Sequence, residues 1–408
     1  MEIRALLKAL WRNRTGPILI AVQIAIVLAV LVNIAYLVVG RIEVYRRPTG
    51  IDVDNIFWVM SQGFGTHYDQ STAVSSDLAY LNGLPGVVAA SATMTVPQNP
   101  FGYNWPFSTV PGVDAPKAFS RIMLMTDRGP DSLGLRFAAG RAPHADATTA
   151  APDPISAISR WAPEVAITQR FADTLFPKGD ALGKTLYTQG INKAAKIVGV
   201  VALMQAAPGS GADGDYNERV VFVPGIPPGP TAMYLVRTQP GRQAEVMVQV
   251  EHSLAERVPA RFIAHMETLA RTAASTRSNL KSSSIILGVV AWMVLAVTAI
   301  GIFGLAAFNV AIRTRQIGTR RAIGARRRHI LRYFLVENWL ISTAGVLAGC
   351  VLALALGAEL SVMFQLPRLP LYYCAFGVAA LWLIGLGATL LPARRAAAVA
   401  PAIATRTV

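Results

Sequence analysis

The sequence predicts an α-helical membrane protein with four transmembrane helices and a mixed α/β extracytoplasmic domain inserted between helices 1 and 2. Three observations lead to this prediction: long apolar stretches, an uneven distribution of charge, and a long near-neutral segment between the first two stretches. Hydrophobic residues make up 53% of the chain and charged residues only 15%, against about 25% charged residues in soluble domains. The polar residues are therefore too few for an ordinary soluble protein of this length.

Four apolar stretches are each long enough to cross the hydrocarbon core, which takes about 20 helical residues. We place the predicted spans at residues 17–39, 285–312, 333–358 and 371–393. The first span has 23 residues and no charge, whereas the apolar core of a cleaved signal peptide has about 7–15 residues. We therefore expect the first span to be retained as a helix.

Basic residues flank these spans in three segments, residues 1–16, 313–332 and 394–408. Together the segments hold 15 cations and one acid, nearly the whole net charge of +15, whereas residues 40–284 hold 22 basic and 20 acidic residues. Basic residues next to spans stay in the cytoplasm. The sequence therefore predicts cytoplasmic termini, a cytoplasmic segment at 313–332 and an outside domain at 40–284. Cations split in this way contact membrane lipids and do not form a nucleic-acid surface.

The outside domain shows signals for both strands and helices. Short stretches rich in β-branched and aromatic residues predict strands at residues 55–60, 196–201, 220–223 and 234–237. Helices are predicted at 76–84 and 169–176, and one or two helices from 243 to 280 whose last part is a stalk leading to the second span. Stretches at 145–154 and 206–213 have the composition of exposed loops.

Nothing in the sequence predicts a catalytic residue, a metal site or a bound cofactor. His67, His144, His252 and His265 lack ligand spacing, and both cysteines, Cys350 and Cys374, lie in apolar stretches. Residues 179–185 (GDALGKT) resemble a phosphate-binding loop, but three residues separate the glycines where that loop needs four. The segment is also predicted to lie outside, away from cytoplasmic ATP. We expect a non-catalytic chain.

The informative segment follows the second span, where arginines alternate with small and apolar residues. On a helix, Ile317, Arg321 and Gly324 share one side, and Arg320 and Arg327 lie on the adjoining flank. Such a helix can lie along the membrane surface and offer guanidinium groups to a partner. The segment therefore predicts a cytoplasmic docking element.

This segment resembles the signature of the MacB/FtsX-type ABC transporter permeases, which reads approximately E-R-x-R-E-I-G-x-R-R-A-L-G-A and is followed by F-L-x-E. The matching positions are Arg315, Ile317, Gly318, Arg320, Arg321, Ala322, Gly324, Ala325, Phe334, Leu335 and Glu337. The chain departs from the signature at Gln316, where the family typically has Glu, and at Ala311 or Ile312, where an acid often precedes.

Three other places resemble the same family. Residues 164–186 (EVAITQRFADTLFPKGDALGKTL), followed by 197–200 (IVGV), are similar to part of its periplasmic core domain. Residues 299–304 (AIGIFG) are similar to the middle of its second helix, and 392–396 (PARRA) with 401–402 (PA) to its C-terminal ending. The resemblance thus covers most of the chain.

The resemblance implies a multi-pass permease subunit of the bacterial inner membrane. Its partners would be cytoplasmic ABC ATPase subunits that bind ATP and Mg, a second permease in a homodimer or heterodimer, and a periplasmic adaptor with an outer-membrane channel. The chain has no Walker motif, so the ATPase is expected on a separate polypeptide. In this family, ATPase closure is thought to be transmitted through the spans to the outside domain, which moves a substrate such as a peptide or antibiotic.

The resemblance also implies roles for individual residues. The ATPase-coupling residues would be Arg313, Arg315, Gln316, Ile317, Gly318, Arg320, Arg321, Gly324 and Ala325. Glu337 would pair with Arg320, Arg321 or Arg332, or be a solvated carboxylate at the interface. Gly301 and Gly304 would let the second spans pack across a dimer.

Two alternative functions lie within the family. One is a lipoprotein-release permease, whose outside domain handles lipid-anchored cargo. The other is a non-transporting regulator of a cell-wall hydrolase, for which the outside domain is large. A stand-alone membrane sensor is a further alternative, and the cytoplasmic motif argues against it.

Overall fold

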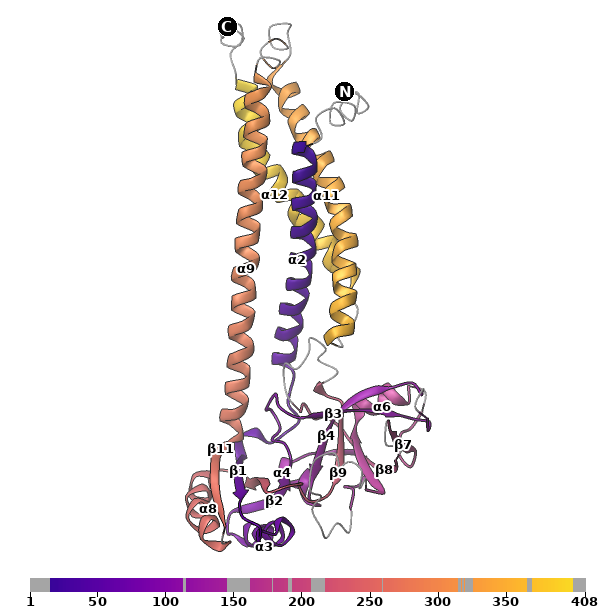
Figure 1. Cartoon of the computed structure of the whole chain (residues 1–408), viewed down its shortest axis with the longest axis vertical. Coiled ribbons are helices and arrows are strands. Elements are labelled where there is room, and N and C mark those ends of the chain that lie inside the picture. Colours follow the sequence, from indigo (N-terminus) through magenta and orange to yellow (C-terminus); the bar gives the residue numbers. More distant parts are fainter. Residues whose placement is uncertain are drawn as a thin grey trace. The chain divides into compact units, whose positions relative to one another are not determined.

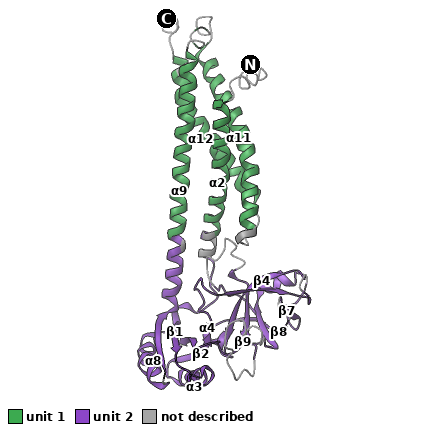
Figure 2. Ribbon diagram, viewed as in Figure 1, with its two compact units in different colours: residues 1–40, 282–408 green, residues 41–281 purple. Residues whose placement is uncertain are grey.

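The protein is described by a computed structural model that covers residues 15–112, 115–144, 162–177, 179–189, 193–206, 217–258, 260–314, 317, 319, 326–364 and 369–398. The chain forms two compact units (Figures 1 and 2). Unit 1 comprises Met1–Gly40 and Ser282–Val408, and unit 2 comprises Arg41–Lys281.

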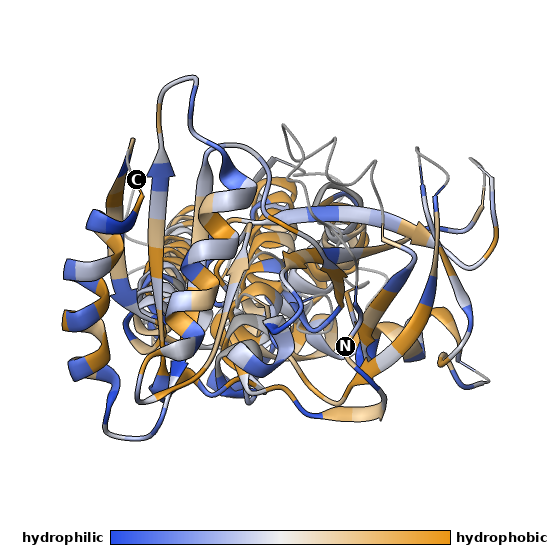
Figure 3. Cartoon of the chain, turned by 90° about the horizontal axis from the view of Figure 1, so that it is seen from below, coloured by the Kyte–Doolittle hydropathy of each residue, from blue (hydrophilic) through white to orange (hydrophobic). Residues whose placement is uncertain are grey.

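Unit 1 is helical. Its helices are α2 (Thr15–Arg46), α9 (Leu269–Ile312), α11 (Arg327–Phe364) and α12 (Leu371–Ala398), and α2 and α9 also extend into unit 2. Each of the four is long and apolar enough to cross a membrane, and the helices are coloured mostly orange in Figure 3. The predicted spans 17–39, 285–312, 333–358 and 371–393 fall within these four helices.

Helix α2 packs closely against α11 in the core of unit 1. Its residues Ile24 and Leu28 are fully buried, one helical turn apart. Facing them, α11 carries a Gly-x-x-x-Gly motif at Gly345 and Gly349. A Cβ atom added at Gly345 would lie 2.7 Å from the Ala21 carbonyl oxygen, and one added at Gly349 would lie 2.9 Å from Leu28 Cβ. Glycine at both positions therefore sets the separation of the two backbones, as in many membrane helix pairs.

A polar side chain adds to the contact between α2 and α11. Asn33 is buried in α2, and its Nδ2 donates to the Ala353 carbonyl oxygen of α11 at 3.1 Å and to the Ala29 carbonyl oxygen of its own helix. Such bonds between apolar helices are worth about 0.6–2 kcal/mol. Asn33 thus fixes the register of α2 against α11 more than it adds stability.

The described residues of unit 2 form one sheet of eleven strands. The strands are β1 (Ile56–Gly63), β2 (Val87–Thr93), β3 (Tyr103–Ser108), β4 (Ala118–Met125), β5 (Phe137–Gly140), β6 (Glu164–Thr168), β7 (Thr185–Thr188), β8 (Ala194–Val201), β9 (Val220–Pro224), β10 (Thr231–Thr238) and β11 (Arg261–Thr268). Four of them form an open part in the order β11-β1-β10-β2. The strands β4-β3-β7-β8-β6-β9 form a ring, because β4 also pairs with β9.

The two parts of the sheet meet at a single pair of residues, Thr93 of β2 and Met125 of β4. Three apolar clusters fill unit 2. One lies inside the ring and contains Phe107 and Phe171. A second joins the ring to the open part and includes Leu269, the first residue of α9. Sheet closure in the ring leaves fewer free strand edges. The ring and the open part are two lobes that share the second apolar cluster.

Short helices cover the lobes: η1 (Val53–Asn55), α3 (Gln70–Gly83), α4 (Gly129–Leu133), α6 (Gln169–Leu175) and α8 (Gln243–Arg257). α3 and α8 pack on one face of the open sheet and form the third cluster. In α8, Val246, Val250 and Leu254 are fully buried, as expected from their spacing of four residues on one helix face. Asp69 caps the N-terminus of α3, because its side chain accepts from the Ser71 and Thr72 amides.

A buried polar cluster lies beneath these helices. The carboxylate of Asp77 forms an ion pair with Arg261, and the Tyr234 hydroxyl donates to Asp77 Oδ2 at 2.6 Å. The Asp77 and Arg261 side chains are completely buried. Burial and the neighbouring carboxylate raise the pKa of Tyr234 above its usual range. The cluster links α3, β10 and β11, since one member comes from each.

The strands predicted at 55–60, 196–201, 220–223 and 234–237 lie within or overlap β1, β8, β9 and β10, and the helices predicted at 76–84 and 169–176 overlap α3 and α6. The prediction of only helices from 243 to 280 is wrong in its middle, where β11 pairs antiparallel with β1. Arg261 is drawn into this strand by its buried partner Asp77. The loop predicted at 145–154 lies outside the described residues, and so does the loop predicted at 206–213 apart from Ala206, which is buried and not exposed as predicted.

Candidate functional site

The candidate site is the end of unit 1 where α9 ends, α11 begins and α12 ends. The helical hydrogen bonds of α9 continue beyond Ile312: the Arg313 amide donates to Asn309 and the Ile317 amide donates to Arg313, at 3.2 and 3.0 Å. The described residues Arg313 and Ile317 thus keep a helical hydrogen-bond spacing beyond the end of α9.

Ile317 anchors this end of α9 in a small apolar cluster. It is buried with Ile330 of α11 and Ala397 of α12, and Val310 and Phe334 pack against them. Three helices thus meet at one isoleucine, which matches the family signature. Loss of its side chain would leave a cavity among all three.

An ion pair joins the same helices a few residues away. Arg313 Nη1 lies 2.9 Å from both carboxylate oxygens of Glu337. The Arg313 and Glu337 side chains are only 19% and 10% exposed, so water screens the pair weakly. The pair connects the end of α9 with the third turn of α11.

The predicted partners of Glu337 were different. Arg332 is described and exposed, and it forms no ion pair with Glu337, so that prediction is wrong. Arg332 lies five residues before Glu337 on the same helix, a spacing that places the two side chains on different sides. Arg320 and Arg321 lie outside the described residues.

A cavity of about 30 Å³ lies next to this ion pair and is bounded by all four helices. Its polar lining comes from Asn309, Glu337, Asn338 and Thr389. Asn338 Nδ2 and Thr389 Oγ1 both donate to the Gly385 carbonyl oxygen, at 3.1 and 2.9 Å. The space and the polar groups suit about one water molecule.

Exposed cations surround the site. Arg326, Arg327 and Arg328 precede or open α11, and Arg394 and Arg395 lie near the end of α12. Cations in the first turn of a helix oppose its macrodipole, which favours anions there. The macrodipole therefore does not favour three arginines at this position.

The remaining predicted coupling residues, Arg315, Gln316, Gly318, Arg320, Arg321, Gly324 and Ala325, lie outside the described residues. The structure therefore places two members of the predicted set, Arg313 and Ile317. Both contact α11, and neither contact was predicted.

The two glycines of α9 differ in their surroundings. A Cβ atom at Gly301 would lie 2.7 Å from Gln23 Nε2 of α2, so this glycine makes a close contact within one chain. At Gly304, such an atom would have no neighbour within 4 Å. Packing across a dimer is therefore not needed to explain Gly301, and it stays a prediction for Gly304.

Much of α9 is left uncovered by the other helices of unit 1. Only 11% of the most apolar 18-residue stretch of α9 is buried, against 44% of the corresponding stretch of α2. Trp292, Val297, Ile300 and Phe308 are among its exposed side chains. An apolar face of this size requires lipid or another apolar surface around it.

In the described part of unit 2 no three His, Cys, Asp or Glu side chains gather as a metal site. His144 pairs with Asp127 at 2.8 Å on the surface. A nearby ion pair joins Arg141 to Glu164, and its hydrogen bonds hold the pKa of Glu164 below the usual range. These are surface contacts between loops and strand ends.

Comparisons with known proteins agree with this description. Residues 288–401 match the family model of the FtsX-like permease C-terminal domain. The macrolide export ATP-binding/permease protein MacB of Wolinella succinogenes is 30% identical over 264 residues, which cover 60% of this chain and 38% of the relative. The pyoverdine export ATP-binding/permease protein PvdT of Pseudomonas syringae pv. tomato is 40% identical over 121 residues, or 30% of this chain and 18% of the relative.

Among solved structures, the periplasmic region of MacB from Actinobacillus actinomycetemcomitans aligns with 55% of this chain and 94% of its own length, at 12% identity and a TM-score of 0.33. The chain spans less than half the length of the two relatives above. The resemblance to MacB/FtsX-type permeases read from the sequence is confirmed by the family model and these relatives.

Proposed function

From its FtsX-like permease domain at residues 288–401 and its similarity to MacB proteins, we propose that this chain is the permease subunit of a MacB-type ABC transporter. It couples ATP hydrolysis by a separate ATPase subunit to the movement of a substrate on the outer side of the inner membrane. The observation that supports this most is the anchoring of Arg313 and Ile317, because it ties the signature segment to three membrane helices.

The coupling would begin at residues 313–325, which form the contact with the ATPase. When the ATPase dimer closes around ATP and Mg, this segment is displaced. Arg313 passes the displacement to α11 through Glu337, and Ile317 passes it to α11 and α12 through its apolar cluster. The cavity of about 30 Å³ beside Glu337 gives the helix ends room to move.

The outside domain would then carry out the mechanical work. α2 and α9 each run without a break from unit 1 into unit 2. Movement of the two helices therefore reaches the domain through continuous helical backbone, which transmits displacement along its axis better than a loop does. Substrate is moved outside the membrane and does not thread between the helices.

The proposed topology has both termini and residues 313–332 in the cytoplasm and residues 40–284 in the periplasm. The exposed apolar face of α9 would meet lipid or the second permease of the dimer. A periplasmic adaptor and an outer-membrane channel complete the assembly if the substrate leaves the cell. The relatives' names combine ATP-binding and permease functions in one protein, whereas here we propose that a partner polypeptide binds ATP.

Export of a peptide, an antibiotic or a siderophore is the leading substrate assignment, since the relatives are a macrolide exporter and a pyoverdine exporter by name. A lipoprotein-release permease is the second candidate. Regulation of a cell-wall hydrolase is the third, and the sheet of eleven strands in the outside domain argues against it.

Two experiments test the proposal. Affinity purification of the chain from its own cells should recover an ABC ATPase in stoichiometric amount. In that complex, Arg320→Glu with Arg321→Glu should abolish stimulated ATPase activity. Lys193→Glu with Lys196→Glu is the matched control, because it makes the same charge change on exposed cations of unit 2. Full activity in the first variant, or equal loss in both, would refute the coupling role.

A further inference from the structure

Two segments of unit 2 continue into membrane helices. Residues 47–55 follow the end of α2 at Arg46, and residues 269–281 form the base of α9. The two segments are more than 200 residues apart in the sequence. Any direct connection between them would make the two helices act on the domain together.

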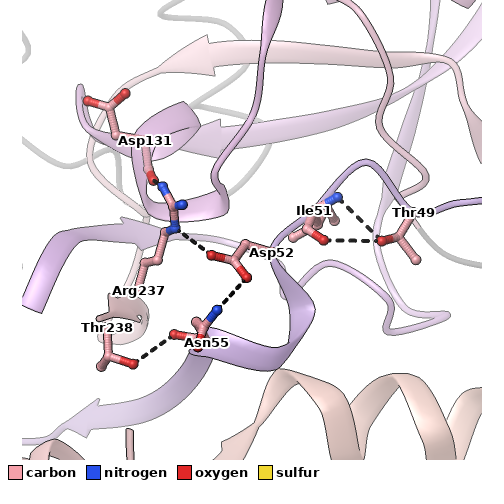
Figure 4. Close-up of polar contacts among 7 residues, drawn as sticks. All are labelled: Thr49, Ile51, Asp52, Asn55, Asp131, Arg237 and Thr238. Carbon is pink, nitrogen blue, oxygen red and sulfur yellow. Dashed lines mark hydrogen bonds and ion pairs between the residues drawn. The ribbon is translucent and has the colours of Figure 1, made fainter. Parts of the chain in front are cut away.

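The first segment is fixed to the open sheet (Figure 4). Asp52 accepts hydrogen bonds from Arg237 Nε and Asn55 Nδ2, each at 2.8 Å, and the Asn55 carbonyl oxygen accepts from Thr238 Oγ1 at 3.0 Å. The Arg237 guanidinium also reaches the Asp131 carbonyl oxygen. These bonds tie the segment to the strand β10.

The same segment also touches residues that follow β8. The Gln205 amide donates to the Thr49 carbonyl oxygen at 2.8 Å. At Gly50, with φ +72°, a Cβ atom would lie 2.2 Å from the Leu203 carbonyl oxygen. A side chain at this position would separate the two backbones, so glycine permits the hydrogen bond beside it.

The second segment is anchored by its side chains. Leu269 is fully buried, and Thr272 Oγ1 accepts a hydrogen bond from Trp58 Nε1 at 2.8 Å. One turn further along, Thr276 Oγ1 donates to the Gln98 carbonyl oxygen at 2.8 Å. The base of α9 is thus tied to the loop between β2 and β3.

Gln98 connects the two segments. Its side-chain Nε2 donates to the Gln205 carbonyl oxygen at 2.6 Å, and its backbone N–H donates to the Ala206 carbonyl oxygen. A carbonyl oxygen only accepts, so the nitrogen of the Gln98 amide group must face Gln205. An unbroken sequence of contacts therefore runs from Thr49 through Gln205 and Gln98 to Thr276; the last three residues are buried, and Thr49 is partly buried.

Two features of Gln98 are unfavourable on their own. Its φ is +63°, a left-handed conformation uncommon for residues other than glycine. Its Oε1 is buried, and no described group donates to it. Local strain and an unsatisfied oxygen persist only where surrounding contacts enforce them, and such positions concentrate at functional sites.

We propose that Gln98 and Thr276 form a clasp that locks the exit of α2 to the base of α9, so that the two segments move as one body. Gln98 is a positioning residue in this scheme. The mechanical role rests on the proposed transport function, because only a force-transmitting domain needs the two helices to act together. The physical linkage does not depend on that function.

The test is a distance measurement between nitroxide spin labels in the full chain in lipid nanodiscs, without ATPase or substrate. Labels are attached at Arg46→Cys and Ser275→Cys, both exposed positions, after Cys350 and Cys374 are replaced by alanine. The double variant Gln98→Leu, Thr276→Val removes both side-chain hydrogen bonds. We expect a single narrow distance distribution in the parent and one about twofold wider in the double variant.

Thr188→Val is the matched control, since Thr188 is a buried threonine of unit 2 whose hydroxyl donates to the Lys193 carbonyl oxygen within one hairpin. It should leave the distribution narrow. An unchanged distribution in the double variant overturns the clasp, and so does equal widening in the control.

If the double variant fails to fold, the comparison of Thr276→Val with Thr276→Ser decides. Serine keeps the hydroxyl and should preserve the narrow distribution, while valine should widen it; equal widths overturn the clasp. Absence of a co-purifying ATPase would refute the proposed function and leave this result unaffected.

Discussion

The ion pair between Arg313 and Glu337 makes a quantitative prediction about unit 1. Replacing either residue by glutamine leaves the charged side chain of the other residue largely buried and without its ion-pair partner. Exposed pairs contribute about 0–1 kcal/mol, and breaking a fully buried pair costs about 3–5 kcal/mol. Because the two side chains are 19% and 10% exposed, we expect each single variant to lose about 2–4 kcal/mol of stability.

A double-mutant cycle isolates the pair. In Arg313→Gln with Glu337→Gln, no charge is left unpaired and two amides can bond each other, so the double variant should lose about 1–3 kcal/mol less than the sum of the singles. Thermal unfolding in nanodiscs, followed by Trp fluorescence, reports the losses. The control is Arg332→Gln, an exposed arginine of the same helix that does not pair with Glu337, which should change stability by less than about 0.5 kcal/mol. Single variants as mild as this control, or strictly additive losses, would refute the reasoning.

Three further predictions concern other contacts. Asp77→Ala leaves the Arg261 guanidinium buried without its partner and should cost about 3–5 kcal/mol, measured by denaturant unfolding; an effect below 1 kcal/mol would show that water enters the cluster. Gly349→Leu should separate α2 from α11 and lower the melting temperature of unit 1 more than Gly349→Ala does, and equal melting temperatures would contradict the close packing. Arg141→Ala should raise the pKa of Glu164, because the hydrogen bond from Arg141 holds that pKa low; NMR titration of Glu164 should show the upward shift, and an unchanged pKa would contradict it. The stability that this contact contributes is present above the unfolded-state pKa of Glu164 and is lost as the pH falls through its folded-state pKa.

The membrane helices could be predicted from the sequence because their signal is local. A span needs about 20 apolar residues in a row, and each of the four stretches supplies them. Several strands of the outside domain were predictable for the same reason, since stretches such as 220–223 are β-branched and aromatic. β11 was not, because its sequence between 261 and 268 has mixed polarity and becomes a strand through pairing with β1.

Contacts between distant residues explain the other misses. The partner of Glu337 lies 24 residues away on another helix, and charge patterning along one helix cannot choose among eight nearby arginines. The Gly-x-x-x-Gly motif at Gly345 and Gly349 is a local signal for helix packing. Gln98 carries no local signal, because its role depends on backbone groups of residues 205 and 206 and on Thr276.

The measurement that tests the account most directly is the side of the membrane on which each unit's polar residues lie. In the chain with Cys350 and Cys374 replaced by alanine, single cysteines are introduced at Arg326 in unit 1 and at Asp180 in unit 2, both exposed. A membrane-impermeant maleimide applied to intact spheroplasts should label the cysteine at 180 and reach the one at 326 only after lysis. Labelling at 326 in intact spheroplasts would place the arginine segment away from cellular ATP and contradict the transporter assignment.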